Sequence, residues 1–96
     1  MKDFLNPTEL EKKHTPVIER IGGGEVLVRV GLTPHPMEEA HRIEWIELYR
    51  NKALVERKNL KVGEPAEAIF GILDLKPEDI LVARGLCNIH GLWESV

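Results

Sequence analysis

Residues 25–30, which read Glu-Val-Leu-Val-Arg-Val, carry the clearest structural signal in this chain of 96 residues. Apolar and polar side chains alternate there with a period of two, which is typical of a β-strand with one buried face. Three successive glycines at positions 22–24 precede the run and indicate a tight turn. The stretch therefore predicts a strand that follows a turn.

Similar short runs extend this pattern in both directions along the chain. Residues 17–18 form a short apolar run before the glycines, and turn signals lie at residues 62–65 and 76–79. Short strands with a turn signal about every ten residues are typical of an all-β sandwich. We expect one domain over residues 1–96, with further strands at residues 42–50, 53–60, 66–73 and 80–86.

The local structure is less certain to predict in two stretches, one near the N-terminus and one over residues 33–50. Thr8 can cap a short helical turn over residues 9–11. Thr33 and His35 each precede a proline, so the backbone there is held extended. After this loop, the apolar side chains fit a strand over residues 42–50, but their spacing also fits a helix over residues 37–50.

Composition and charge argue against several classes of function. The net charge is −3 with histidine neutral, whereas a site for nucleic acid or an anionic membrane needs a basic excess. No apolar run approaches the ~20 residues of a membrane span. Residues 1–10 lack the apolar core of a secretory signal. We therefore expect a cytoplasmic protein that binds neither nucleic acid nor membrane.

Four histidines and a single cysteine are the candidates for chemistry. Cys87 and His90 are three residues apart, a spacing that lets a thiolate and an imidazole bind one metal ion. His35 lies between two prolines, so its backbone loses little entropy when a metal fixes its side chain. His14 and His41 are expected in loops or at strand edges. Each residue, taken alone, is also explained by an ordinary structural role.

Taken together, these five donors favour iron over structural zinc. Zinc closes structural sites with four ligands in a tetrahedron, whereas imidazoles and one thiolate form a mixed set that Fe(II) accepts. Five ligands also leave a sixth octahedral position for chemistry. Spacing alone does not decide between the two metals.

Three stretches of the chain carry a resemblance to a known family. They are residues 11–19 (Glu-Lys-Lys-His-Thr-Pro-Val-Ile-Glu), 34–48 (Pro-His-Pro-Met-Glu-Glu-Ala-His-Arg-Ile-Glu-Trp-Ile-Glu-Leu) and 87–93 (Cys-Asn-Ile-His-Gly-Leu-Trp). Residues 63–68 match more weakly. In these stretches the chain resembles the superoxide reductases, the family of neelaredoxin and of the C-terminal domain of desulfoferrodoxin. The second and third motifs are the most specific.

The resemblance implies a fold, a cofactor and an activity. The fold would be an immunoglobulin-like β-sandwich of antiparallel strands. One mononuclear iron per chain, cycling between Fe2+ and Fe3+, would reduce superoxide to hydrogen peroxide without forming dioxygen. Its ligands would be Cys87 on the axis, opposite the open position, and four histidines in the equatorial plane: His14, His35, His41 and His90.

The resemblance also implies partners. A small electron donor such as rubredoxin would re-reduce the iron. Relatives form dimers or tetramers, so we expect a homo-oligomer. Because this sequence contains one cysteine, we expect the one-iron type, without the rubredoxin-like domain of desulfoferrodoxin.

The first motif departs from the family pattern. The family usually reads Glu-Lys-His, whereas this chain reads Glu11-Lys12-Lys13-His14. Lys13 matches the family's lysine, whose cation would attract superoxide and help to protonate the product, so Lys13 is the predicted catalytic residue. Lys12 stands where the family has the glutamate. Either Glu11 reaches the sixth iron position, or solvent takes that position.

Other readings of the same residues remain open. A zinc-binding structural module predicts a colourless protein with a tetrahedral metal site. An electron-transfer protein with an occluded sixth position predicts redox activity without anion binding. A sandwich-type interaction domain predicts no metal at all.

Overall fold

The structure of the chain, a computed structural model, describes residues 9–31 and 35–95. It contains one short helix and seven strands: α1 (Glu9–His14), β1 (Pro16–Gly22), β2 (Glu25–Val30), β3 (Ile43–Arg50), β4 (Ala53–Asn59), β5 (Glu67–Gly71), β6 (Leu81–Cys87) and β7 (Gly91–Glu94). The helix cap predicted at Thr8 and the extended backbone predicted at Thr33 lie outside the described residues. Within those residues, no helix has the length and apolar character needed to cross a bilayer.

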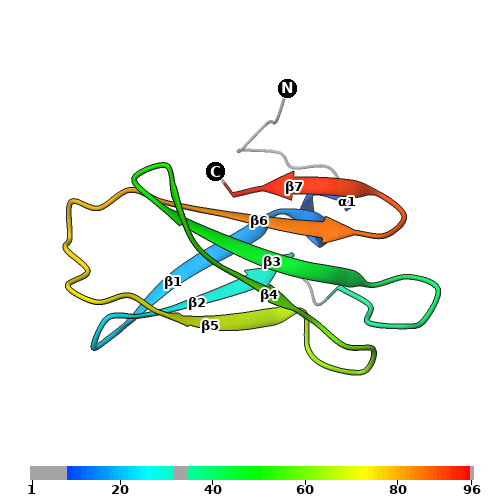
Figure 1. The fold of residues 1–96 in the computed structure, drawn as a ribbon. Helices are drawn as coiled ribbons and strands as arrows, with labels where there is room; N and C mark the ends of the chain where they lie inside the picture. Colours follow the sequence, from blue (N-terminus) through cyan, green and yellow to red (C-terminus); the bar gives the residue numbers. More distant parts are fainter. Residues whose placement is uncertain (1–8, 32–34, 96) are drawn as a thin grey trace.

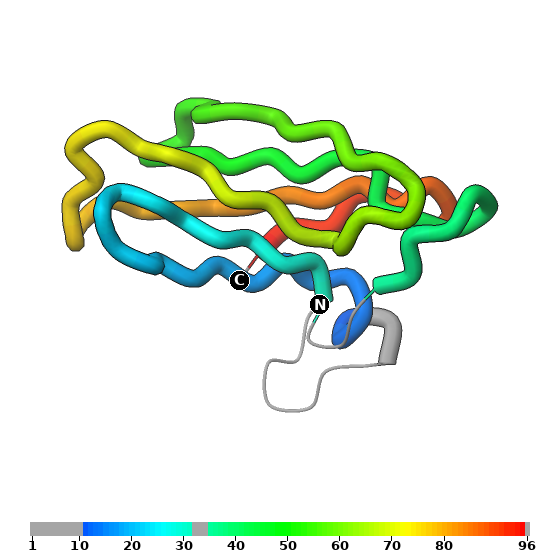
Figure 2. The backbone as a smooth tube through the Cα atoms, turned by 90° about the horizontal axis from the view of Figure 1, so that it is seen from below, coloured from blue at the N-terminus to red at the C-terminus, as the bar shows by residue number. Residues whose placement is uncertain are grey.

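The strands form two antiparallel sheets packed face to face (Figures 1 and 2). One sheet has the order β1-β2-β5, and the other has the order β4-β3-β6-β7. This is the strand arrangement of an immunoglobulin-like sandwich in which the fourth strand has joined the second sheet. The predicted all-β fold, an immunoglobulin-like β-sandwich of antiparallel strands, is confirmed.

The core lies between the sheets because each strand turns alternate side chains inward. Val26, Val28 and Val30 of β2 are buried against Ile46 and Leu48 of β3. Fully burying an apolar side chain of this size contributes roughly 1.5–3 kcal/mol. The period-two run at residues 25–30 thus supplies one wall of the core, as its pattern predicts.

Gly85 of β6 lets the two sheets come close together. A Cβ atom added at Gly85 would lie 3.0 Å from Cγ2 of Val30 on the opposite sheet, a distance shorter than ordinary packing. Gly85 is two residues before Cys87 on β6, so the sheets approach each other closely near the buried cysteine.

Residues 43–50 form a strand, and the helix alternative over residues 37–50 is wrong. β3 pairs with β4 on one side and with β6 on the other, so its backbone groups are satisfied within the sheet. Near the N-terminus, the helical turn predicted for residues 9–11 continues to His14. His14 therefore ends a helix, although the sequence predicted a loop or a strand edge.

Candidate metal centre

The four histidines and Cys87 come from separate segments that meet at one end of the sandwich (Figure 1). His14 is the last residue of α1, and Cys87 is the last residue of β6. His35 and His41 lie in the segment that leads from the first sheet into β3, and His90 lies in the turn between β6 and β7. The structure therefore gathers every residue that the sequence predicted as a metal ligand.

The four imidazole rings are arranged as the corners of a square. Ring centroids are 4.7 Å apart for His14–His35, 4.7 Å for His35–His41 and 4.7 Å for His14–His90. The remaining side, between His41 and His90, measures 5.2 Å, and the diagonal between His14 and His41 measures 6.3 Å. Neighbouring rings meet edge to face, at interplanar angles of 68–79°, so their nitrogen atoms can point inward.

The donor atoms lie at distances that suit a shared metal ion. His14 Nε2 is 3.1 Å from His35 Nε2 and 3.1 Å from His90 Nδ1. Two nitrogens at right angles, each about 2.1 Å from one metal, would be about 3.0 Å apart. Cys87 Sγ lies 3.6 Å from His35 Nε2 and 3.8 Å from His90 Nδ1. The thiol therefore touches two of the rings and belongs to the same cluster.

The His35 ring is held in the neutral form, with Nε2 free to donate to a metal. Its Nδ1–H donates to the backbone carbonyl of Pro36 over 2.7 Å, which leaves the lone pair on Nε2 facing His14 and Cys87. Burial lowers the pKa of His35 to about 4, against the opposing effect of this hydrogen bond. The ring is therefore neutral at pH 7, so Nε2 is available as a donor.

His41 supplies the clearest sign that the cluster fits a metal. Its Nε2 is buried and has no hydrogen-bond partner among the described residues. A buried polar nitrogen without a partner costs about 1–3 kcal/mol, and a bound metal ion would remove that cost. Ligand atoms of His14, His35, His41 and Cys87 all lie within 4.8 Å of one another. The donor set of nitrogen and sulfur suits iron or zinc.

Two further residues support the cluster, and the sequence pattern did not single them out for this role. The side chain of Asn88 accepts from the Arg42 amide over 2.9 Å and donates to the Ala40 carbonyl over 3.0 Å, so it fixes the backbone on both sides of His41. Trp93 stacks on the His14 ring at 5.0 Å, and its Nε1–H donates to the His90 carbonyl over 3.1 Å. No sequence signal marks such supports, because both depend on folding.

The residues before His14 differ in their burial. His14 is fully buried, Lys13 is exposed, and Glu11 and Lys12 are half-buried. The backbone carbonyl of Glu11 accepts the Thr15 amide over 2.9 Å, and Pro16 then begins β1. Because a residue before proline leaves the helical conformation, the helix ends here and His14 stays in its last turn. Lys13 is therefore an exposed residue that immediately precedes a buried candidate ligand in the chain.

Fold and site together define a class: β-sandwich proteins that hold a histidine- and cysteine-lined candidate metal centre at one end. The family described as Desulfoferrodoxin matches residues 6–96 of the chain. This chain belongs to the desulfoferrodoxin family. The resemblance found in the sequence is thereby confirmed.

Individual relatives agree with this assignment. A desulfoferrodoxin homolog from Archaeoglobus fulgidus is 49% identical over 87 residues, which cover 91% of this chain and 65% of that relative. A protein from Pyrococcus abyssi named superoxide reductase is 37% identical, with 99% of this chain and 95% of that protein covered. The chain thus spans about two thirds of the first relative and nearly the whole of the second.

A solved structure shares the fold. The superoxide reductase from Treponema pallidum superposes with a TM-score of 0.75 at 37% sequence identity, covering 90% of this chain and 68% of that one. The coverage of 90% means that the likeness extends over most of this chain.

Proposed function

We propose that this chain reduces superoxide to hydrogen peroxide at one mononuclear iron held by His14, His35, His41, His90 and Cys87. The convergence of these five donors at one end of the sandwich supports the proposal most strongly, because it matches the ligand order of the family motifs. Two of the relatives and neighbours compared above are named superoxide reductase.

The iron would supply one electron to superoxide, which with two protons gives hydrogen peroxide and no dioxygen. The chain's own residues prepare the site for this step. Burial of His14, His35 and Cys87 keeps water away from the inner side of the cluster. His90 is exposed, so the cluster reaches the surface on that side, where a small anion can approach.

Lys13 would attract the substrate. The whole chain carries a net charge of −3, which repels an anion, so any attraction must come from local cations. Lys13 is exposed and immediately precedes His14 in the chain. Its ammonium group can hold superoxide by charge and donate a proton to the product.

Metal content and colour test the core of the proposal. We expect one iron per chain and, in the oxidised protein, a visible charge-transfer band from the thiolate of Cys87. Adding superoxide to the reduced protein should produce this band as the iron is oxidised. Zinc without a band after reconstitution with iron would contradict the reductase function and favour a structural zinc module.

The role of Lys13 has its own test. Lys13→Ala should slow the reaction with superoxide by about tenfold, because one steering cation is lost. Pulse radiolysis measures this rate. Glu11→Ala should leave the rate nearly unchanged, and Lys52→Ala, which removes an exposed lysine from the β3–β4 turn, is the matched control. Equal rates for Lys13→Ala and the parent would remove the steering role.

The partners and the location belong to the same proposal. A small rubredoxin-like protein would return the electron, and the chain would work in the cytoplasm as a homo-oligomer. The free thiol of Cys87 suits a reducing compartment. A small domain also gains stability from association.

A further inference from the structure

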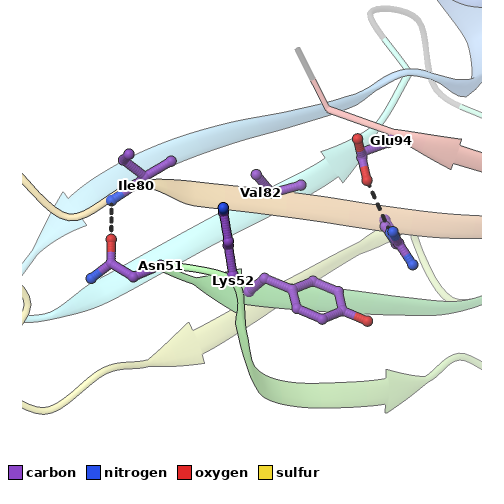
Figure 3. A pocket seen from close by; sticks show the side chains of 7 residues that line it. Asn51, Lys52, Ile80, Val82 and Glu94 are labelled. Carbon is purple, nitrogen blue, oxygen red and sulfur yellow. Dashed lines mark hydrogen bonds and ion pairs between the residues drawn. The ribbon is translucent and has the colours of Figure 1, made fainter.

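Trp93 approaches the candidate metal centre from the last strand. β7 pairs with β6 so that Trp93 lies opposite Gly85, and residues directly opposite each other point to the same side of a sheet. Gly85 faces Val30 of the other sheet, so the indole lies on the inner face. Side chains alternate along a strand, and the next one, Glu94, pairs with Arg84 over 3.0 Å on the outer face (Figure 3). The strand therefore turns its indole away from the outer surface of the sheet.

Two contacts fix this indole against the cluster. It stacks on the His14 ring, with ring centres 5.0 Å apart and planes inclined by 26°, which is within the range of favourable aromatic stacking. Its Nε1–H donates to the backbone carbonyl of His90 over 3.1 Å. Stacking uses the face of the His14 ring, whereas a metal ion would bind the nitrogen lone pair in the plane of that ring. Trp93 can therefore touch His14 without competing with a metal.

Burial limits how an electron can reach the centre. His14 is 0% exposed, His35 is 4% exposed and Cys87 is 1% exposed. A donor protein cannot touch these three side chains directly, so an electron must pass through a group that reaches the surface. The groups that do so include His90, which is exposed, and Trp93, which is half-buried.

The exposed side at His90 is also needed by the substrate. A donor protein that covers His90 would cover the side from which a small anion can approach. Trp93 offers a second connection, which runs from the surface through the indole to His14. Nε2 of His14 then lies 3.1 Å from His35 Nε2 and from His90 Nδ1. Because electron tunnelling weakens steeply with the width of a gap, a stacked aromatic ring is a better connection than an aliphatic side chain.

We propose that Trp93 is the residue through which an electron donor re-reduces the centre. This inference rests on the proposed reductase function. In the step, the donor loses one electron and the oxidised metal gains it, while no bond and no proton moves. The indole connects the two and ends the step unchanged. Trp93 acts through His14, so it is a positioning residue of the reaction.

Two substitutions separate the aromatic ring from the hydrogen bond. Trp93→Phe and Trp93→Leu both remove the bond to the His90 carbonyl, but only Trp93→Phe keeps a ring that can stack on His14. Stopped-flow absorption measures how fast a reduced rubredoxin bleaches the charge-transfer band of the oxidised protein. We expect Trp93→Leu to react at least about tenfold more slowly than Trp93→Phe. Equal rates in these two variants would overturn the proposal.

A purely structural role of Trp93 would change other rates as well. The reaction of the reduced protein with superoxide, followed by pulse radiolysis, should agree within about twofold between the two variants. Reduction by ascorbate, a small donor that can reach the exposed His90, should agree equally well. If Trp93→Leu slowed all three reactions alike, the indole would only hold the ligands in place, contrary to the proposal. If circular dichroism shows that Trp93→Leu does not fold, Trp93→Met supplies a long apolar side chain without a ring.

The fluorescence of the indole tests its contact with the centre without any turnover. In a Trp45→Phe background, Trp93 is the one tryptophan of the chain. Ferric iron should shorten its fluorescence lifetime at least about fivefold relative to zinc, because an excited indole in contact with the centre can reduce ferric iron, whereas zinc has no redox chemistry. Equal lifetimes in the iron-loaded and zinc-loaded proteins would refute the electronic contact and with it the proposal.

Failure of this route and failure of the proposed function look different. An iron-loaded protein whose reduced form does not react with superoxide contradicts the reductase function, although its reduction by rubredoxin still measures the route. An iron-loaded protein that does react with superoxide, but accepts electrons equally fast in Trp93→Leu and Trp93→Phe, contradicts the route alone.

Discussion

Asn88 shows how a single side chain can control a neighbouring metal ligand. Its amide side chain bonds the Arg42 amide and the Ala40 carbonyl, and its backbone amide donates to the Arg42 carbonyl over 3.1 Å. These three bonds join the turn that follows Cys87 to the loop that holds His41. The position of His41 relative to the thiol therefore depends on Asn88.

Replacing Asn88 should weaken metal binding while the fold persists. Asn88→Ala removes both side-chain bonds, so His41 is free to move and the affinity for metal should fall roughly 10–100-fold. Competition with a coloured chelator measures this. Asn59→Ala, at an exposed position of the edge strand β4, is the control. An unchanged affinity in Asn88→Ala would show that His41 is held by other contacts.

At the scale of elements, Asp79 joins the loop before β6 to the end of β3. Its carboxylate accepts from the backbone amide of Lys76 over 2.9 Å, from Asn51 Nδ2 over 3.0 Å and from Arg50 Nε over 2.9 Å. These bonds, led by that from Lys76, lower the pKa of Asp79 from 3.8 to about 2. The charged carboxylate is thus favoured in the folded chain.

This shift predicts how stability changes with acid. A carboxyl group with a lowered pKa stabilises the fold above its unfolded pKa, and this contribution is lost as the pH falls through the folded pKa. The contribution of Asp79 should therefore be complete above about pH 4 and should vanish towards pH 2. Asp79→Asn should unfold at lower denaturant than the parent at pH 7, and the gap should close on acidification.

Asp74→Asn is the control for this series. It keeps the backbone carbonyl that accepts from Arg50 over 2.8 Å and changes an exposed carboxylate in the same loop. Its denaturation midpoint should follow that of the parent at every pH. A gap between Asp79→Asn and the parent that stays constant from pH 7 to pH 2 would disprove the assigned role of the charge.

Some strands could be predicted from the sequence and others could not. The period-two run at residues 25–30 predicted β2 because one face of that strand packs in the core. Residues 37–50 stayed ambiguous, because their apolar spacing fits both periods, and pairing with β4 and β6 decided for a strand. The choice of sheet for β4 depends on tertiary packing, which no local pattern encodes.

The candidate site was also predicted only in part. Residue types and motif resemblance predicted all five clustered residues, because the residue type alone determines whether a side chain can donate to a metal. The supports at Asn88 and Trp93 were missed, since their bonds join residues such as Asn88 and Ala40, far apart in the sequence. Asn and Trp occur in many structural roles, so the residue type does not predict support of a metal centre. The roles of Asn88 and Trp93 become visible only in the folded chain.

At the scale of the whole molecule, the candidate metal centre joins the two sheets. His14 precedes β1 of the first sheet, while Cys87 ends β6 of the second sheet and His90 follows it. His35 and His41 lie in the connection that crosses from one sheet to the other. A metal bound here closes a loop of the chain that runs from residue 14 to residue 90, and closing a loop of this length restricts the unfolded chain.

Metal removal should therefore destabilise the whole fold. A ligand present at 1,000 times its dissociation constant stabilises the folded state by about 4 kcal/mol, and for a domain of this size each kcal/mol shifts the Tm by about 4–8 °C. Chelation should lower the Tm by more than about 10 °C in calorimetry. His90→Ala, which changes an exposed donor, should leave the metal-free Tm near that of the parent and shrink the gain on metal loading. A Tm that is the same with and without metal would show that the two sheets hold together without the centre.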